Sequence, residues 1–353
     1  MVEENVIQTK SCGPIKVYIQ GLKASNVVFL TLHDLGCNHE EMMTFVENEN
    51  MEQMAERCSW IHVEIPGQGG GETDLPSDYE FPTMQQLAKA MSEICDNLSL
   101  KHVVLFGEGA GANILARLAM LREELILGAV LINCIPTSAG AVENIRDRVI
   151  GRKLNNIGMN PAAESYLIAH RFGTANDTRE DLRMKPTLNT FRKSLQNEIN
   201  PRNLNKFIMS FMARTKIISE VDNLRCPILL LTGALSIHNQ TVHRFFKALR
   251  HSAENEPERL KRIELIQFDD VANVLRGRPE RVADCLQYFI QGLGLGGGIV
   301  NRRMSNTIPL QGRARSYSME EYDQPKGVAS CVFDKNRKYS TAFDEGDDET
   351  SEV

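Results

Sequence analysis

Residues 101–115 read KHVVLFGEGAGANIL, an apolar run followed directly by a cluster of small residues. The run over 102–106 is rich in β-branched and aromatic residues, as in a buried strand. After the small residues, the apolar spacing becomes that of a helix. A sharp turn from strand to helix needs small residues, which Gly107, Gly109 and Gly111 supply. The segment therefore predicts a strand, a tight turn and a helix at the centre of an α/β sheet.

Similar apolar runs recur on both sides of this unit and alternate with helical patterns. The predicted strands cover residues 15–20, 27–33, 60–65, 102–106, 127–134, 227–231 and 263–268. The predicted helices cover about 39–58, 83–98, 110–123, 239–251 and 279–291. Runs that are apolar on both faces are typical of strands buried in a parallel sheet. The alternation predicts a doubly wound, mostly parallel sheet with helices on both faces.

Two segments depart from this alternation. Residues 138–222 are amphipathic and helical in pattern, with no convincing strand, and we interpret them as a helical cap inserted into the fold. After a glycine-rich stretch at 292–298, serine, arginine, glycine and acidic residues dominate. Little apolar surface remains there to offset the entropy of ordering the chain. We therefore predict one domain over 1–299 and a disordered regulatory tail over 300–353.

The composition excludes several classes of protein. With 353 residues and a net charge of -6, the chain has no basic surface suited to nucleic acid. Its amino terminus lacks the pattern of a signal peptide, and no apolar run approaches the roughly 20 residues of a membrane helix. The eight cysteines form no C-x-x-C pair, which indicates reduced thiols in a cytoplasmic protein. Neither they nor the eight histidines show metal-ligand spacing, so we predict no metal or cofactor.

The turn at 107–111 matches the nucleophile elbow of α/β-hydrolases, G-x-S-x-G, except at its central position. Alignment on the two outer glycines places Gly109 where the serine would be. The same letters fit a dinucleotide-binding turn, G-x-G-x-x-A. That motif expects an acidic residue at the end of the next strand, where this chain has Ile132-Asn133-Cys134. The hydrolase-like turn without a nucleophile is therefore the favoured interpretation.

The other two catalytic positions are located by chain order, because this fold supplies the acid and then the histidine after the serine. The strand at 228–233 leads to Ser236 where an acid is common. Counting back from the proline at 279 places Ala272 or Asn273 at the base position. A serine triad needs a nucleophile, a base and an orienting carboxylate. With Gly109, Ser236 and Ala272 in these places, we predict no triad hydrolysis.

Polar and small residues remain at the predicted mouth of the sheet. We assign a vestigial pocket to His33, Asp34, Gly36, Glu108, Gly109 and Ala110. His33 and Asp34 are candidates for acid–base chemistry, and Cys37 is a candidate thiol nucleophile. Adjacent residues do not make a catalytic dyad, since a base must face its partner, and hydrogen bonding within the loop is favoured. Two alternatives stay open: an atypical hydrolase using these three residues, and a sensor that binds a small ligand or lipid in the pocket.

Together these motifs resemble the N-myc downstream-regulated (Ndr) family of α/β-hydrolase-like proteins. The matching stretches are 33–39, 63–67, 109–117, 130–133 and 288–294, and the resemblance spans about 15–300. It implies a cytoplasmic pseudoenzyme in signal transduction that acts through protein partners in stress response, differentiation, growth control and trafficking. The cap matches only loosely, so the resemblance assigns no partner surface there.

The tail carries short motifs of regulation. Ser318 completes R-x-R-x-x-S, and Ser305 and Ser316 also follow arginines, as basophilic kinases require. The resemblance also implies tail phosphorylation, which adds about -1.5 to -2 charge at each site. The arginines within 302–315 predict weak peripheral contact with anionic lipid. The last residues, Ser351-Glu352-Val353, resemble a ligand of PDZ domains.

Overall fold

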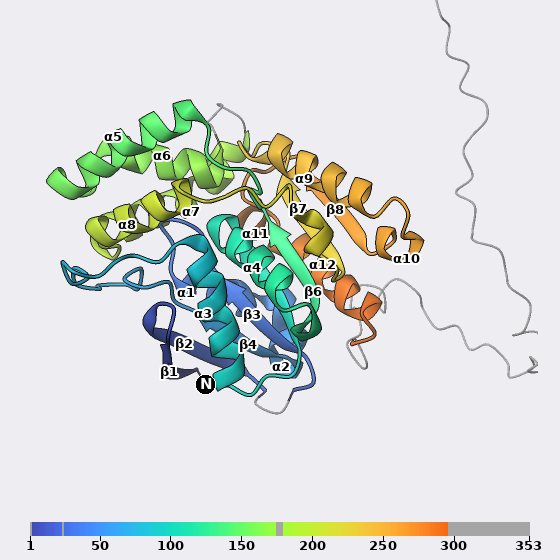
Figure 1. Cartoon of the computed structure of the whole chain (residues 1–353). Helices are drawn as coiled ribbons and strands as arrows, with labels where there is room; N and C mark the ends of the chain where they lie inside the picture. The colour runs from blue at the N-terminus through green and yellow to red at the C-terminus, as the bar shows by residue number, and fades with distance from the viewer. Residues whose placement is uncertain (1, 23–24, 174–178, 296–353) are drawn as a thin grey trace, which may run out of the picture. The chain divides into compact units, whose positions relative to one another are not determined.

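An eight-stranded sheet runs through the computed structural model, which describes residues 2–22, 25–173 and 179–295 (Figure 1). The strand order is β1-β2-β4-β3-β5-β6-β7-β8. The strands are β1 (Glu3–Thr9), β2 (Gly13–Gly21), β3 (Val28–Leu32), β4 (Ser59–Val63), β5 (Val103–Glu108), β6 (Ile126–Ile132), β7 (Ile228–Gly233) and β8 (Ile263–Phe268). Only β1–β2 and β2–β4 pair antiparallel, and the other neighbours are parallel. The predicted mostly parallel sheet is confirmed.

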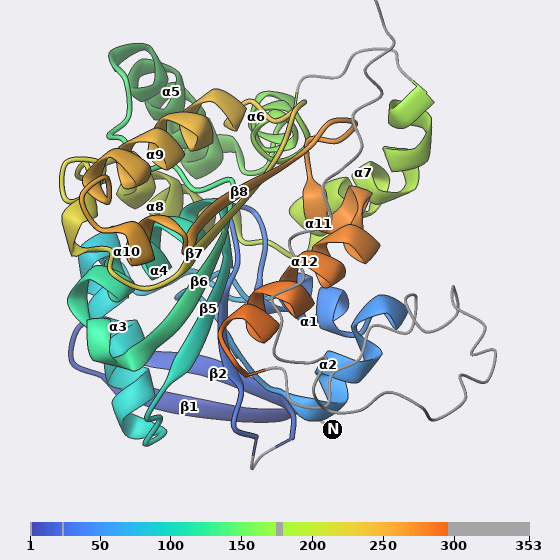
Figure 2. The ribbon, with the colours of Figure 1, turned by 90° about the vertical axis from the view of Figure 1, so that its right-hand side faces the viewer.

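Helices cover both faces of the sheet (Figure 2). One face is covered by α1 (His39–Val46), α2 (Glu52–Arg57) and α12 (Pro279–Gly292). The other is covered by α3 (Met84–Asn97), α4 (Gly109–Leu121) and α9 (Asn239–Ser252). Two short helices, α10 (Pro257–Leu260) and α11 (Val274–Gly277), complete this part of the fold. The arrangement is the doubly wound one that the sequence predicts.

The central strands are apolar at consecutive positions because both of their faces are buried. In β3, Phe29 faces the layer of α1, α2 and α12, whereas Leu30 faces the opposite layer. The ring of Phe29 stacks on that of Trp60 in β4, with centroids 4.0 Å apart. The side chains of Val104 and Leu105 in β5 divide between the two faces in the same way. Alternation along each strand thus fills two separate cores.

Four helices form the predicted cap between β6 and β7 (Figure 1). They are α5 (Ala141–Ile157), α6 (Pro161–Phe172), α7 (Arg179–Asn197) and α8 (Pro201–Met212). Local sequence explains where α6 begins and ends. Asn160 accepts a hydrogen bond from the Ala163 amide, Pro161 occupies the first turn, and Gly173 follows the last turn with a φ of +76°. The length of α6 is therefore set by local sequence.

One strand was not predicted from the sequence. β1 pairs with β2 along seven residue pairs, from Glu3 opposite Ile19 to Thr9 opposite Gly13. Its exposed positions are mostly polar, and it buries little beyond Ile7, so it lacks the apolar run of a central strand. Within the described ranges, no helix has both the length and the apolar character needed to cross a bilayer. The predicted disordered tail at 300–353 lies outside the described residues.

Candidate functional site

The junction of β5 and α4 has the geometry of a nucleophile elbow. Gly109, the first residue of α4, has a φ of +53°, in the left-handed region that glycine adopts most readily. Gly111 lies against β3, because a Cβ on this residue would be 2.4 Å from the carbonyl oxygen of Leu32. The sequence KHVVLFGEGAGANIL thus forms the strand, turn and helix that it predicts.

The space beside Gly109 is filled by the carboxylate of Asp34. A Cβ on residue 109 would lie only 2.1 Å from Asp34 Cγ. The amide of Ala110 donates a hydrogen bond of 2.8 Å to Asp34 Oδ1. In hydrolases the amide that follows the nucleophile helps to form the oxyanion hole. Here Asp34 takes both the place of a nucleophilic side chain and the hydrogen bond of that amide.

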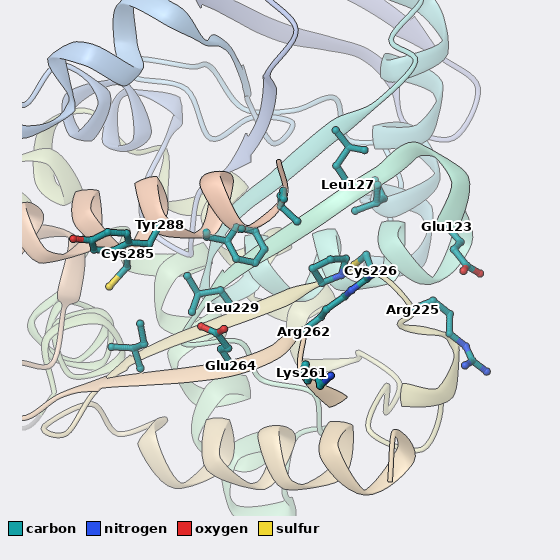
Figure 3. Close-up of a pocket in the computed structure, with 16 residues that line it drawn as sticks. Glu123, Leu127, Arg225, Cys226, Leu229, Lys261, Arg262, Glu264, Cys285 and Tyr288 are labelled. Atoms are coloured by element: carbon teal, nitrogen blue, oxygen red, sulfur yellow. The ribbon is translucent and has the colours of Figure 1, made fainter. Parts of the chain in front are cut away.

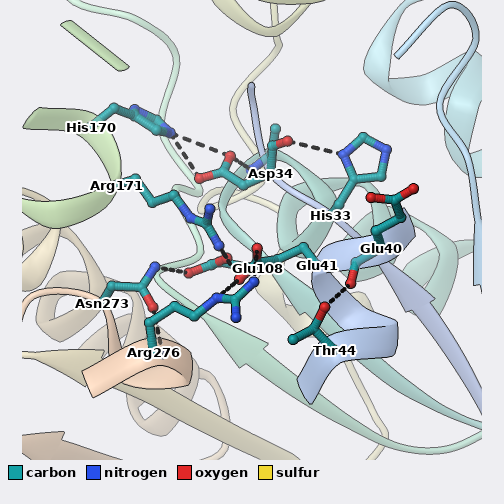
Figure 4. Close-up of polar contacts among 11 residues, drawn as sticks. His33, Asp34, Glu40, Glu41, Thr44, Glu108, His170, Arg171, Asn273 and Arg276 are labelled. Carbon is teal, nitrogen blue, oxygen red and sulfur yellow. Dashed lines mark hydrogen bonds and ion pairs between the residues drawn. The ribbon is translucent and has the colours of Figure 1, made fainter. Parts of the chain in front are cut away.

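Asp34 is held from the other side by the cap. His170, near the end of α6, places Nε2 3.0 Å from Asp34 Oδ2 and 3.3 Å from Oδ1 (Figure 4). Burial raises the pKa of Asp34, but His170 and the Ala110 amide outweigh this and lower it to about 2. Asp34 is therefore a buried, ionised carboxylate joined to both the elbow and the cap.

A second histidine lies against His170. The ring centroid of His238 is 4.6 Å from that of His170, and the two planes meet at 68°. Burial and the neighbouring His170 lower the pKa of His238 to about 3, so it stays neutral at ordinary pH. Its Nε2 is buried and has no hydrogen-bond partner among the residues that the structure describes.

The predicted acid and base positions serve local structure. Ser236, after β7, accepts a hydrogen bond of 3.2 Å from the amide of His238. Ala272, after β8, is buried, and a Cβ on Gly173 at the end of α6 would lie 3.1 Å from its Cβ. Asn273 accepts a hydrogen bond from the amide of Arg276 at the start of α11. Ser236 and Asn273 thus accept hydrogen bonds from nearby backbone amides, and Ala272 packs against Gly173.

A charge cluster of Glu41, Glu108, Arg171 and Arg276 lies next to Asp34 (Figure 4). Arg276 binds Glu41 through two hydrogen bonds, Nε to Oε1 at 2.8 Å and Nη2 to Oε2 at 2.7 Å. Arg171 forms an ion pair with the same carboxylate, and its Nη2 is 3.6 Å from Glu108 Oε2. Asn273 donates to Glu108 Oε1 at 2.9 Å. The cluster thus connects α1, the elbow, the cap and α11.

The two acids of the charge cluster differ in their acidity. Burial raises the pKa of Glu108 to about 7, and Arg171 only partly opposes this effect. Burial also raises the pKa of Glu41, but Arg171 and Arg276 outweigh it, so the net change is a decrease. Glu41 is therefore the ionised partner of the two arginines, whereas Glu108 changes its charge near neutral pH.

His33 and Cys37 do not join Asp34 in one constellation. The His33 ring donates from Nδ1 to the main-chain oxygen of Asp34 at 3.0 Å, and its Nε2 is 2.9 Å from Glu64 Oε1. Glu64 also binds His39 Nδ1 at 2.6 Å. Burial raises the pKa of the Cys37 thiol well above its usual value, which opposes thiolate formation. His33 thus pairs with Glu64. Its ring lies on the opposite side of Asp34 from His170 (Figure 4).

The sheet has a cavity near each end of its strands. The larger, about 820 Å³, is at the amino ends of β6, β7 and β8 beside α12, where Leu127, Leu229 and Glu264 line it (Figure 3). The elbow is at the carboxyl end of β5, so this cavity is remote from it. The smaller, about 480 Å³, lies beside the charge cluster and is lined by Gly36 and Cys37 among others. Because ligands of open α/β sheets bind at the carboxyl ends of strands, the smaller cavity is the better candidate site.

Sequence reasoning located part of this site. Asp34, Gly109 and Ala110 come together, Glu108 joins the charge cluster, and Gly36 lines the smaller cavity. Sequence reasoning missed their partners from distant segments, which are Glu41, Glu64, His170, Arg171, Arg276 and His238. The sequence offered two signals for them: Glu64 lies in the matching stretch 63–67, and the adjacent His170 and Arg171 precede a helix-ending glycine. The predicted phosphorylation sites and the PDZ-like terminus lie outside the described residues.

Solved structures of hydrolases resemble this chain at low sequence identity. A thermophilic esterase from Thermogutta terrifontis superposes with a TM-score of 0.67 and 15% identity, covering 82% of this chain and 99% of the esterase. An enol-lactonase from Burkholderia xenovorans gives a TM-score of 0.63 and 13% identity, covering 81% of this chain and 100% of the lactonase. At such identities the similarity establishes the α/β-hydrolase fold and leaves the activity open.

Sequence comparison gives the family. An uncharacterized protein of Caenorhabditis elegans, ZK1073.1, is 32% identical over 340 residues, which cover 93% of this chain and 96% of that protein. Protein NDRG1-A of Xenopus laevis is 28% identical over 304 residues, covering 83% of this chain and 72% of that protein. The family model described as Ndr matches residues 4–296. This chain, with its α/β-hydrolase fold, therefore belongs to the Ndr family.

Proposed function

We propose that this chain is a non-catalytic signalling or adaptor protein, a pseudoenzyme that uses the hydrolase fold as a scaffold. The observation that carries the proposal is the position of Asp34. Its carboxylate lies where a nucleophile would project from residue 109, and it accepts the hydrogen bond of the Ala110 amide. A substrate carbonyl would have to displace this buried carboxylate to reach the elbow.

Asp34 is itself poorly suited to be a replacement nucleophile. Its side chain is 4% exposed, and it accepts hydrogen bonds from the Ala110 amide and His170. These contacts stabilise the negative charge and lower its pKa to about 2, which makes the carboxylate a weak base. An acid–base reaction through His33 and Cys37 is also disfavoured. Both ring nitrogens of His33 already face protein groups, the Asp34 main-chain oxygen and Glu64, and burial opposes ionisation of the Cys37 thiol.

Membership of the Ndr family supports the remaining parts of the proposal. We place the protein in the cytoplasm, with roles in stress response, differentiation, growth control and trafficking that it exerts through protein partners. A basophilic kinase would phosphorylate Ser318, and also Ser305 and Ser316. Weak contact of the arginine-rich segment with anionic lipid and binding of Ser351-Glu352-Val353 to a PDZ domain are further proposals of the same kind. Each added phosphate would oppose the lipid contact through its negative charge.

Turnover of activated esters tests the absence of catalysis. We expect purified protein to hydrolyse 4-nitrophenyl acetate, 4-nitrophenyl butyrate and an acyl thioester no faster than its His33→Ala, Asp34→Asn and Cys37→Ser variants. Residual activity shared by all four proteins would come from a contaminating hydrolase. Saturable turnover that any one of these substitutions abolishes would contradict the proposal and identify an atypical hydrolase.

Phosphorylation of the tail is tested separately. We expect a basophilic kinase to phosphorylate the full chain at Ser318, with the signal reduced in Ser318→Ala and removed when Ser305 and Ser316 are also replaced by alanine. Phosphopeptide mass spectrometry checks the positions. Phosphate found only on residues of 1–299 would contradict the assignment of the tail as the regulated segment.

A further inference from the structure

The cavity of about 480 Å³ beside the charge cluster has the features of a ligand site. It lies between α1, α7 and α11, with the end of α6 contributing Arg171 and Phe172. Its volume falls within the roughly 300–1,000 Å³ that is usual for small-molecule sites. Its lining combines two aromatic rings, several hydroxyl groups and two arginines, so one side can pack against an apolar group while another binds a polar one.

Arg171 is the unusual residue of this lining. Its side chain is only 3% exposed, and its Nε has no hydrogen-bond acceptor within the part of the chain that the structure describes. A buried donor without an acceptor loses its hydrogen bonds to water and gains none in return. The rings of Phe172 and Phe191 flank its guanidinium at 5.3 and 5.1 Å. These rings hold the arginine in place but supply no oxygen for the remaining N–H group.

Within the charge cluster, the two arginines are only partly neutralised by its acids at neutral pH. Arg171 and Arg276 share one carboxylate, that of Glu41. The other acid of the charge cluster, Glu108, has a pKa of about 7 and so balances the second arginine only in part at neutral pH. The neighbouring Asp34 carboxylate is bound to His170. The exposed rim adds Glu40, Glu198 and Lys193, which lie in water and are screened. Two guanidinium groups that share one fully ionised carboxylate thus line the cavity.

We propose that this cavity binds a small organic anion with a carboxylate or phosphate-monoester head and an apolar body. The head accepts hydrogen bonds from Arg171 and Arg276, whose forked donors match both groups. The body packs against Phe172 and Phe191. The site is separate from the elbow, and no covalent step is involved. The inference goes beyond the proposed function, because a ligand can bind here whether or not the chain has any hydrolytic activity.

Titration with defined probes tests the inference on the full chain. Benzoate and phenyl phosphate represent the two head groups, inorganic phosphate lacks the apolar body, and benzyl alcohol lacks the charge. We expect saturable 1:1 binding of benzoate or phenyl phosphate by calorimetry, weaker binding of inorganic phosphate and none of benzyl alcohol. In ¹H–¹⁵N spectra the amides of Gly36, Thr44 and Thr190 should shift. The better of the two aromatic anions identifies the head group.

Arg276 is partly exposed and Thr190 is exposed, so substitutions there should leave the fold intact and report on binding. Arg276→Gln removes one fork but leaves Glu41 paired with Arg171, and Thr190→Trp fills the cavity without changing any charge. Each should weaken binding about tenfold or more, as expected for loss of a charged hydrogen bond. Arg225→Gln, at the remote cavity, is the matched control and should bind as the wild type does.

The inference would be overturned by any of three results. The first is that neither aromatic anion binds at up to about 10 mM, the weak limit of a useful site. The second is that Arg276→Gln and Thr190→Trp bind as tightly as the wild type. The third is that benzyl alcohol competes as well as benzoate does. The ester assay reports separately on catalysis, so a failure here leaves the proposed function untouched.

Discussion

Position 109 imposes two requirements that glycine meets: a positive φ and the absence of a Cβ. Its positive φ disfavours any other residue, and the Asp34 carboxylate occupies the space that a Cβ would need. The glycine predicted from the sequence as a lost nucleophile is, in the structure, one half of a packing contact. A serine at this position would require Asp34 to leave both the Ala110 amide and His170.

The cost of that contact is measurable by comparing two glycines. Gly71 has a φ of +70° and nothing within 4 Å of its potential Cβ, whereas Gly109 has Asp34 at 2.1 Å. Both alanine substitutions incur about 1–2 kcal/mol of backbone strain. Gly109→Ala should lose about 1–3 kcal/mol more from overpacking. Urea denaturation of the two variants checks this difference, and equal destabilisation would mean that Asp34 moves aside freely.

Glu108 should make stability depend on pH near neutrality. Its pKa is about 7 in the folded chain and close to 4.5 when unfolded, so the folded state binds the extra proton between these values. Stability from this group is complete below about pH 4.5 and is lost as the pH rises through 7. Glu108→Gln mimics the neutral acid. In urea denaturation, the stability of this variant relative to the wild type should be higher at pH 8 than at pH 5. The same relative stability at both pH values would contradict the raised pKa.

Among the elements, α6 connects the cap to the sheet through its last turn. His170 binds Asp34, which is 136 residues earlier in the sequence, and Arg171 binds Glu41. The helix begins and ends at residues with clear local signals, Asn160 and Gly173. Those signals fix the length of α6 but not its neighbours. The position of its last turn over the elbow is therefore a tertiary feature.

Removal of His170 should loosen this connection. His170→Ala leaves Asp34 as a buried carboxylate without its main partner, which costs about 3–5 kcal/mol. His251→Ala is the control, because His251 pairs with Glu254 but is 85% exposed, and should cost about 0.5 kcal/mol or less. Hydrogen exchange should accelerate over residues 161–172 in the first variant only. Equal protection in both variants would show that α6 is held mainly by its apolar contacts.

The central elements could be predicted from sequence because burial on both faces leaves a continuous apolar pattern, as in β3 and β5. β1 could not, since an edge strand with polar exposed positions has no such pattern. The site was predictable where its residues follow a strand that the sequence pattern marks, as for Asp34 after β3 and for Gly109 and Ala110 after β5. The pair of Glu41 and Arg276 joins positions 235 residues apart, and no local spacing encodes it.

The stability of the whole molecule should be highest at mildly acidic pH, because the two buried acids Asp34 and Glu108 have pKa values shifted in opposite directions. Asp34 has a folded pKa of about 2 and an unfolded value near 3.9, so its contribution is present above about pH 4 and is lost as the pH falls through 2. The urea midpoint of the wild type should fall steeply between pH 4 and 2. Asp34→Asn should be less stable at pH 5 but should show a flatter decline, and parallel declines would contradict this role of Asp34.

The central claim is that the Asp34 carboxylate occupies the space beside Gly109, and its ionisation state tests this most directly. The measurement follows the ¹³C resonance of the Asp34 carboxyl group by NMR as the pH is lowered. Contact with His170 and the Ala110 amide predicts that this resonance keeps its ionised position down to the acid unfolding transition. A titration at or above about pH 4, the value of an unperturbed aspartate, would contradict it. In that case the carboxylate would be free of its partners, and the space beside Gly109 would be open to a substrate.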